Sequence, residues 1–282
     1  MSSFLHTQLC CQFKKNNNAA IAVLFYMLEN IPILIDFDGV LNVSGKVPED
    51  AKEFLNFLIN NNIPTHILSN STLKTGDEIK AFLKSNSLPY VIPCMTTVDA
   101  TVQYIKTKNL KVSVYCDKNI INYFDSFIKD DKPDAVVIGD LGDGWNYKIL
   151  NEIFNKVLSG SEIIAMQMNK YWIKNNKPNL DVGSFVSVIE YASSKKATVI
   201  GKPSQIYFKE ALKFLDFPED NKFIMIGDDI YNDIEGAQKL GGKGILIYTG
   251  KTTKDIAESS GIIPEWEVNN LKEIKKLLIS FN

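Results

Sequence analysis

The chain has 282 residues and is 45% hydrophobic, enough for one large domain or two modest ones with a substantial core. Its 31 basic and 33 acidic residues nearly balance, and the absence of a basic block or stripe argues against a nucleic-acid partner. The four cysteines have no metal-ligand spacing, which indicates reduced thiols and a cytoplasmic protein. With only two histidines, any enzymatic proton transfer is expected to use carboxylates.

Residues 1–30 differ from the rest, because a Lys-rich and Asn-rich stretch is followed by the apolar run Ala19 to Leu28. That run is too short to span a bilayer, so we expect no membrane association. We interpret the segment as a poorly ordered extension, with a targeting segment as the alternative.

Beyond residue 30, short apolar runs alternate with amphipathic stretches of helical periodicity. This alternation predicts an α/β fold, with a parallel sheet and helices on both of its faces. We predict helices over Asp50 to Ile59, Ile120 to Ile128 and Phe208 to Leu215. We predict strands over Ile31 to Phe37, Pro64 to Leu68, Val112 to Tyr115, Ala135 to Ile138, Ile163 to Met166, Thr198 to Ile200, Phe223 to Ile226 and Gly244 to Tyr248.

The first strand ends in the sequence IPILIDFDGVLN, which places Asp36 and Asp38 directly after a buried apolar run. In an extended chain, residues two apart point to the same side, so the two carboxylates are expected to converge. They would then repel each other unless a cation binds between them. The alternative is that both are solvated residues at a strand end.

Two further strand ends carry polar side chains. Ser69 and Asn70 follow the second run, and they are suited either to donating hydrogen bonds to phosphate oxygens or to capping a helix. Lys202 follows a later strand between Gly201 and Pro203, where it is either a solvated charge or an ammonium turned inward.

Another apolar run, ending at Ile226, is followed by Asp228, Asp229 and Asp233. Helix capping explains one of these acids but not all three. If Asp228 and Asp233 meet the first two acids at one edge of the sheet, the four form an oxygen-only site of the type that suits Mg²⁺.

In this order, Asp-x-Asp-Gly-Val, Ser-Asn, Gly-Lys-Pro and Gly-Asp-x4-Asp resemble the four motifs of the haloacid dehalogenase superfamily of phosphohydrolases. The resemblance implies a Rossmann-like core, residues 31–109 and 182–282. It also implies an inserted, smaller α/β cap of the C2 type, residues 110–181. Members with this cap often dimerise through it, so a homodimer is an expectation.

The resemblance also implies a role for each motif. Asp36 is expected to be the nucleophile that forms an aspartyl phosphate, and Asp38 the general acid and base. Mg²⁺ would be bound by Asp36, Asp38 through its main-chain carbonyl, Asp228, and Asp233 through water. Gly39, Ser69, Asn70 and Lys202 would bind the phosphoryl group of a small phosphorylated substrate or of inorganic pyrophosphate.

Within the expected cap, the segment from Met166 to Trp172 resembles a loop that carries two basic residues before a pair of aromatic residues. Here Met168 replaces one basic residue and Lys170 keeps the other, so Lys170 is expected to contact the substrate. We expect Trp172 to lie in the core of the cap.

Two other classes of function compete with this interpretation. A phosphoaccepting receiver domain also combines strand-end acids, a hydroxyl residue and a lysine, but it is about half this length and lacks Asp-x-Asp-Gly. A catalytically silent scaffold with the same fold is the second alternative, although all four motifs are intact.

Overall fold

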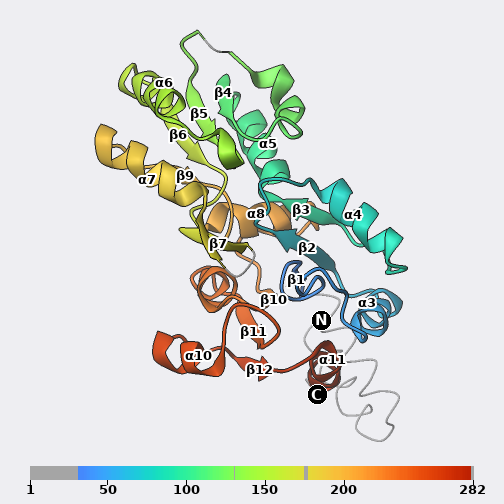
Figure 1. Ribbon diagram of the computed structural model, residues 1–282. Coiled ribbons are helices and arrows are strands. Elements are labelled where there is room, and N and C mark those ends of the chain that lie inside the picture. Colours follow the sequence, from blue (N-terminus) through green and yellow to red (C-terminus); the bar gives the residue numbers. More distant parts are fainter. Residues whose placement is uncertain (1–30, 130, 175–176, 281–282) are drawn as a thin grey trace, which may run out of the picture. The chain divides into compact units, whose positions relative to one another are not determined.

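The computed structural model describes residues 31–129, 131–174 and 177–280, and these form two compact units (Figure 1). The first unit contains the described residues of 31–67, 83–92 and 212–280. The second unit contains the described residues of 68–82 and 93–211. The division into a core and a cap at residues 109/110 and 181/182 stays a prediction. The predicted extension of residues 1–30 lies outside the described residues.

Six strands form one sheet in the order β12-β11-β10-β1-β2-β3, and the boundary between the units falls within β2. The pairs β1–β10, β10–β11 and β11–β12 are parallel. All residues of β1 and β10 are buried, as expected for central strands of a parallel sheet. The strands are β1 (Ile33–Asp36), β2 (Thr65–Ser69), β3 (Cys94–Thr96), β10 (Ile224–Gly227), β11 (Lys243–Ile247) and β12 (Trp266–Val268).

Helices α3 and α11 of the first unit each bury one apolar stripe, because their apolar residues recur every three or four positions. In α3 the stripe includes Phe54, Leu55 and Leu58, as predicted. The helices α3 and α11 are joined by an ion pair between Lys275 Nζ and Glu53 Oε1 at 2.7 Å. This unit contains α3 (Ala51–Asn60), the π-helical turn η4 (Ile230–Glu235), α9 (Gly236–Gln238), α10 (Lys254–Ser260) and α11 (Leu271–Ile279).

A second parallel sheet, in the order β4-β5-β6-β9, lies entirely in the second unit. Side chains of α6 and α7 form a hydrophobic core with it, including Ile153, Val186 and Ile138. Trp145 stacks on Phe185 beside this core, with their ring centroids 4.2 Å apart. The elements are β4 (Val112–Tyr115), β5 (Ala135–Ile138), α6 (Tyr147–Leu158), β6 (Glu162–Ala165), α7 (Val182–Ser193) and β9 (Thr198–Val199).

The remaining elements include an antiparallel hairpin, β7 (Tyr171–Lys174) and β8 (Lys177–Leu180), also in the second unit. Helix α5 (Thr97–Lys108) begins with a capping box, in which Asp99 accepts from the N–H of Thr96 at 2.8 Å. The other helices are α4 (Gly76–Ser85), α8 (Gln205–Phe214) and the short 3₁₀ helices η2 (Ile121–Phe127) and η3 (Gly142–Gly144).

The predicted fold class is confirmed, because helices and strands alternate and the larger sheets contain parallel pairs. In place of the predicted helix over Ile120 to Ile128, the structure has the 3₁₀ helix Ile121–Phe127. Phe124 is fully buried, whereas Ile121 and Ile128, the residue after the helix, are only partly buried. Within the described parts of the chain, no helix is both long and apolar enough to cross a membrane.

Candidate active site

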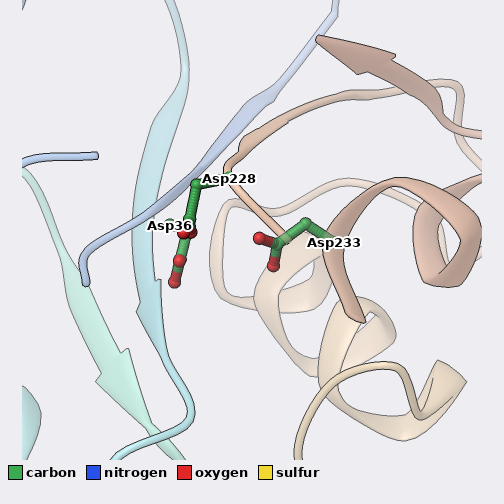
Figure 2. A group of neighbouring side chains, drawn as sticks. All are labelled: Asp36, Asp228 and Asp233. Atoms are coloured by element: carbon green, nitrogen blue, oxygen red, sulfur yellow. The ribbon is translucent and has the colours of Figure 1, made fainter. Parts of the chain in front are cut away.

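Three buried carboxylates gather where strands β1 and β10 end (Figure 2). Asp36 is the last residue of β1, and Asp228 directly follows β10. Because β1 and β10 are parallel neighbours in register, their carboxyl ends meet at one edge of the sheet. One oxygen each from Asp36, Asp228 and Asp233 lies within 4.8 Å of the other two. The structure therefore brings together three of the four acids that the sequence predicts for a metal site.

Asp233 reaches this group from the π-helical turn η4. Asp229 caps the turn, since its Oδ1 accepts from the backbone N–H groups of Tyr231 and Asn232, both at 3.1 Å. Asp233 Oδ2 in turn accepts from the N–H of Asp229 at 3.1 Å. The cap thus fixes the start of the turn, and the turn directs Asp233 toward Asp228 and Asp36 (Figure 2).

The three acids have the electrostatics of a cation site. The pKa of Asp228 is raised to about 6, first by burial and second by the charge of Asp233. Its Oδ2 accepts from the N–H of Lys251 at 2.6 Å, whereas its Oδ1 is buried without a hydrogen-bond partner. A buried carboxylate oxygen that lacks a donor fits a metal ligand, and an all-oxygen set fits Mg²⁺.

Glycines surround Asp228 because side chains would not fit there. Gly39 has a φ of +93°, and a Cβ at that position would overlap the Asp228 carboxylate. Gly250 approaches the same carboxylate closely enough that a Cβ would overlap it too. Gly39 also accepts a hydrogen bond from Thr249 Oγ1 through its carbonyl oxygen, at 2.5 Å. The predicted site residue Gly39 therefore lies against the acidic group.

The carboxylate of Asp38 does not converge with that of Asp36 in this acidic group, although strand alternation predicted that it would. The strand ends at Asp36, and the N–H groups of Leu41 and Asn42 both bond to the carbonyl of Phe37 at 2.9 Å, which forms a turn. Asp38 is exposed on this turn, and its Oδ1 accepts from Asn42 Nδ2 at 3.0 Å. Its carboxylate is not among those that gather in the described part of the chain. Its roles as general acid and as a main-chain metal ligand stay predictions.

Ser69, Asn70 and Lys202 form a second group of predicted residues, all in the second unit. Asn70 Oδ1 accepts from the N–H of Lys202 at 2.9 Å, and Asn70 Nδ2 donates to the Lys202 carbonyl at 2.8 Å. Gly201 permits this approach, because a Cβ there would be within 2.9 Å of Asn70 Oδ1. Lys202 is therefore buried and held through its backbone, rather than solvated.

The backbone of Ser69 is fixed by Tyr207, a residue that sequence reasoning did not identify. The Tyr207 hydroxyl lies 2.7 Å from the Ser69 carbonyl and 2.8 Å from the Met95 carbonyl, and it accepts from the Ser69 N–H at 3.2 Å. Ser69 Oγ accepts from the N–H of Ser71 at 3.1 Å. Ser69 and Tyr207 are fully buried, and the hydroxyl of Tyr207 links the end of β2 to the middle residue of β3.

The segment with Lys170 is held by the start of α7. The Lys170 carbonyl accepts from the N–H of Asp181 at 3.1 Å and from Ser184 Oγ at 2.5 Å. The Lys170 side chain itself is exposed. Trp172 is 43% exposed, so the expectation that it lies in the core of the cap is wrong. It belongs to the hairpin strand β7, which pairs with β8 alone, and the residues of β8 are all exposed.

Lys251 was also not identified from the sequence, although it is a polar residue that follows a predicted strand, as the other candidate residues do. It lies four residues after β11, the sheet neighbour of β10. Its Nζ is 3.0 Å from Asp229 Oδ2. Partial desolvation acts to lower the pKa of Lys251, but the charges of Asp229 and Asp36 outweigh it and raise the pKa above its ordinary value.

Family models and relatives agree with this geometry. A model described as "Haloacid dehalogenase-like hydrolase" matches residues 33–127, and a second model of hydrolases of this type matches residues 199–274. Haloacid dehalogenase-like hydrolase domain-containing protein 2 from Mus musculus is 31% identical over 222 residues, which cover 78% of this chain and 84% of the relative. The chain belongs to the haloacid dehalogenase-like hydrolase family. The predicted membership is thereby confirmed.

Other members of the haloacid dehalogenase-like family are similar over comparable lengths. Phospholysine phosphohistidine inorganic pyrophosphate phosphatase from Danio rerio is 29% identical over 227 residues, covering 78% of this chain and 83% of the relative. The solved p-nitrophenyl phosphatase from Archaeoglobus fulgidus has a TM-score of 0.80 at 21% identity, covering 88% of this chain and 99% of that one. At 21% identity, the similarity to the solved phosphatase establishes the fold alone.

Proposed function

We propose that this haloacid dehalogenase-like hydrolase is a Mg²⁺-dependent phosphatase that acts through an aspartyl-phosphate intermediate. The observation that carries the proposal is the group formed by Asp36, Asp228 and Asp233, with a buried oxygen of Asp228 that lacks a donor. A receiver domain or a silent scaffold of similar fold is the weaker candidate, because the chain matches a relative from the hydrolase family over 78% of its own length.

Asp36, Asp228 and Asp233 would hold the cation, with the Asp38 carbonyl as a further ligand. When bound, Mg²⁺ supplies positive charge that neutralises the phosphoryl oxygens and the gathered carboxylates. This explains how three acids are accommodated in a buried position, where their mutual repulsion would otherwise be unfavourable.

In the proposed reaction, a carboxylate oxygen of Asp36 attacks phosphorus, and the bond from phosphorus to the leaving oxygen breaks. Asp38 gives its proton to that leaving oxygen. A water molecule then attacks the phosphorus of the aspartyl phosphate while Asp38 takes the water proton. The phosphate is released, and Asp36 is regenerated.

Binding of the phosphoryl group is assigned to Lys202, Ser69 and the backbone near Gly39. Asn70 has its amide directed at the backbone of Lys202, which supports a role in holding that lysine. Holding the backbone of Lys202 limits how far its ammonium can move, and a preorganised charge stabilises developing charge with less reorganisation during the reaction.

The substrate is a small phosphorylated molecule or inorganic pyrophosphate. Support for this range comes from the name of the Danio rerio relative, which includes inorganic pyrophosphate, phospholysine and phosphohistidine. The p-nitrophenyl phosphatase with a similar fold supports phosphate esters. A cytoplasmic location and a homodimer through the predicted cap stay part of the proposal.

The test is a phosphatase assay of the full chain over pyrophosphate, sugar phosphates, nucleotides, pyridoxal phosphate and phosphoamino acids. Activity should disappear with a chelator and return with Mg²⁺. Ca²⁺ should inhibit, because its larger and looser coordination misplaces the nucleophile. Full activity in chelator or in Ca²⁺ would contradict the proposed metal site, and inactivity on every compound would favour the scaffold.

A further inference from the structure

The segment from Thr249 to Thr252 encloses Asp228 through backbone contacts. The N–H of Lys251 donates to Asp228 Oδ2 at 2.6 Å, and the N–H of Thr252 donates to the Asp228 carbonyl at 3.1 Å. Thr252 Oγ1 accepts from the N–H of Ile230 at 3.0 Å. These bonds do not involve the side chain of Lys251, so the position of this residue beside the acids is set by its backbone.

The side chain of Lys251 brings a positive charge to this location. Its ammonium lies 3.0 Å from Asp229 Oδ2, and Asp229 is adjacent in sequence to the candidate metal ligand Asp228. The charges of Asp36 and Asp233 act on the same ammonium. The lysine side chain is 63% exposed, whereas that of Asp229 is 13% exposed, so the ammonium is reached by solvent on one side.

Two cations would therefore act on one set of carboxylates. Gathering three buried acids is unfavourable unless positive charge is nearby, and Lys251 provides some of it before any metal binds. When a divalent cation enters, the charge of Lys251 opposes it. The same residue should thus stabilise the metal-free protein and weaken metal binding.

We propose that Lys251 is an internal counter-cation of the acidic site, a positioning residue whose charge competes with Mg²⁺ for Asp36, Asp228 and Asp233. The proposal rests on the proposed function in one respect, namely that the acids bind Mg²⁺. It assigns to Lys251 an effect on metal affinity that does not require hydrolysis.

The first measurement is calorimetric titration of the full chain with MgCl₂ alone. Lys251→Met keeps the apolar stem and removes the charge, and it should bind Mg²⁺ about fivefold more tightly, the range of a partly exposed ion pair. Asp229→Asn removes a negative charge and should weaken binding. Lys239→Met is the control, because Lys239 has a similarly exposed side chain that pairs with Glu235 at 2.8 Å. The Kd of this variant for Mg²⁺ should not change.

The second measurement is the melting temperature of the same proteins in EDTA and in saturating Mg²⁺. Lys251→Met should lower the melting temperature in EDTA, and Mg²⁺ should restore most of the loss, because tighter binding stabilises the folded state by linkage. A side chain that only packs against the segment would give equal losses in both buffers and an unchanged Kd. That result would overturn the proposal.

Failure of the proposed function and failure of the counter-cation role of Lys251 give different results. If the variant shows the expected changes but the protein hydrolyses no phosphate, the proposed function fails and the counter-cation role stands. If the enzyme is active with Mg²⁺ but Lys251→Met binds Mg²⁺ with unchanged or lower affinity, the counter-cation role alone fails. If the unmodified protein binds no Mg²⁺, both are overturned.

Discussion

Asn70 and Lys202, 132 positions apart in the sequence, pair as two peptide groups would. The side-chain amide of Asn70 donates to the Lys202 carbonyl at 2.8 Å and accepts from the Lys202 N–H at 2.9 Å. The amide therefore holds the lysine from a distant part of the chain. A role in positioning follows from this pairing, in addition to the direct contact with phosphate that the sequence predicts.

Replacing Asn70 with alanine separates these two roles. Asn70→Ala leaves the backbone of Lys202 without both partners, so the free energy of unfolding should fall by about 1 to 3 kcal/mol. The value of kcat/KM should fall with it. Urea unfolding and steady-state kinetics provide the two readouts, and exposed Asn86→Ala is the control. Loss of activity at unchanged stability would instead indicate that Asn70 contacts only the substrate.

Asp36→Asn should abolish turnover, because an amide does not attack phosphorus. The fold should be retained, since the change removes one charge from three that repel each other. We therefore expect a melting temperature in EDTA at or above that of the unmodified protein. Substantial Mg²⁺-dependent activity in this variant would rule out Asp36 as the nucleophile.

Gly39→Ala should weaken Mg²⁺ binding by about tenfold or more, as expected when a neighbour of a metal ligand is displaced. The added Cβ would overlap the Asp228 carboxylate. Gly241→Ala is a matched control, because Gly241 also has a positive φ, +82°, but a Cβ there would meet nothing within 4 Å. Both variants should lose roughly 1 to 2 kcal/mol of stability from the left-handed backbone. Equal Mg²⁺ affinities would show that the Gly39 contact is unimportant.

The stability of the metal-free protein should depend on pH through Asp228. Its pKa of about 6 in the folded state exceeds the ordinary value of 3.8, so the folded protein binds this proton more tightly than the unfolded chain does. The free energy of unfolding should therefore fall as pH rises from about 4 to about 6, by at most roughly 3 kcal/mol, and then level off. Urea unfolding in EDTA measures this.

Asp228→Asn provides the control for that experiment, since the amide does not titrate. Subtracting its pH profile from that of the unmodified protein removes the contributions of other groups. Parallel profiles would mean that the pKa of Asp228 is not raised in the folded state.

Lys170→Ala should reduce kcat/KM for pyrophosphate more than for p-nitrophenyl phosphate. The exposed ammonium is available to a second anionic group, and a hydrogen bond to such a group contributes about 1 to 3 kcal/mol. Lys177→Ala is the control, because Lys177 is an exposed lysine on the strand paired with β7. An unchanged ratio between the two substrates would show that Lys170 does not face the substrate.

The parts of this fold that could be predicted are those with a strong local pattern. Strands β1 and β10 are short, β-branched and wholly buried, which makes them visible in the sequence. The three residues of β3, Cys94–Thr96, and of β12, Trp266–Val268, form no apolar run. They are strands because neighbouring strands supply their hydrogen bonds, which a local pattern does not record.

The candidate site likewise has residues that a local pattern predicts and residues that depend on contacts outside such a pattern. Asp36, Asp228 and Asp233 were predictable because acids after buried runs are unusual. The exposed turn that carries Asp38 was not, since it depends on two N–H groups sharing the carbonyl of Phe37. The hydroxyl of Tyr207 at the end of β2 depends on a contact 138 residues along the chain, and a single sequence contains no sign of it.

The π-helical turn at Ile230–Glu235 makes the length of this segment as important as its composition. A π turn contains more residues than an α turn, and removing one residue would allow it to become an ordinary helix. Each residue of an α-helix turns the chain by about 100°, so the shortened segment would point the carboxylate of Asp233 away from Asp228 and Asp36. Substitutions that keep the length would be accepted more readily here than a single deletion, even one of an exposed residue such as Tyr231.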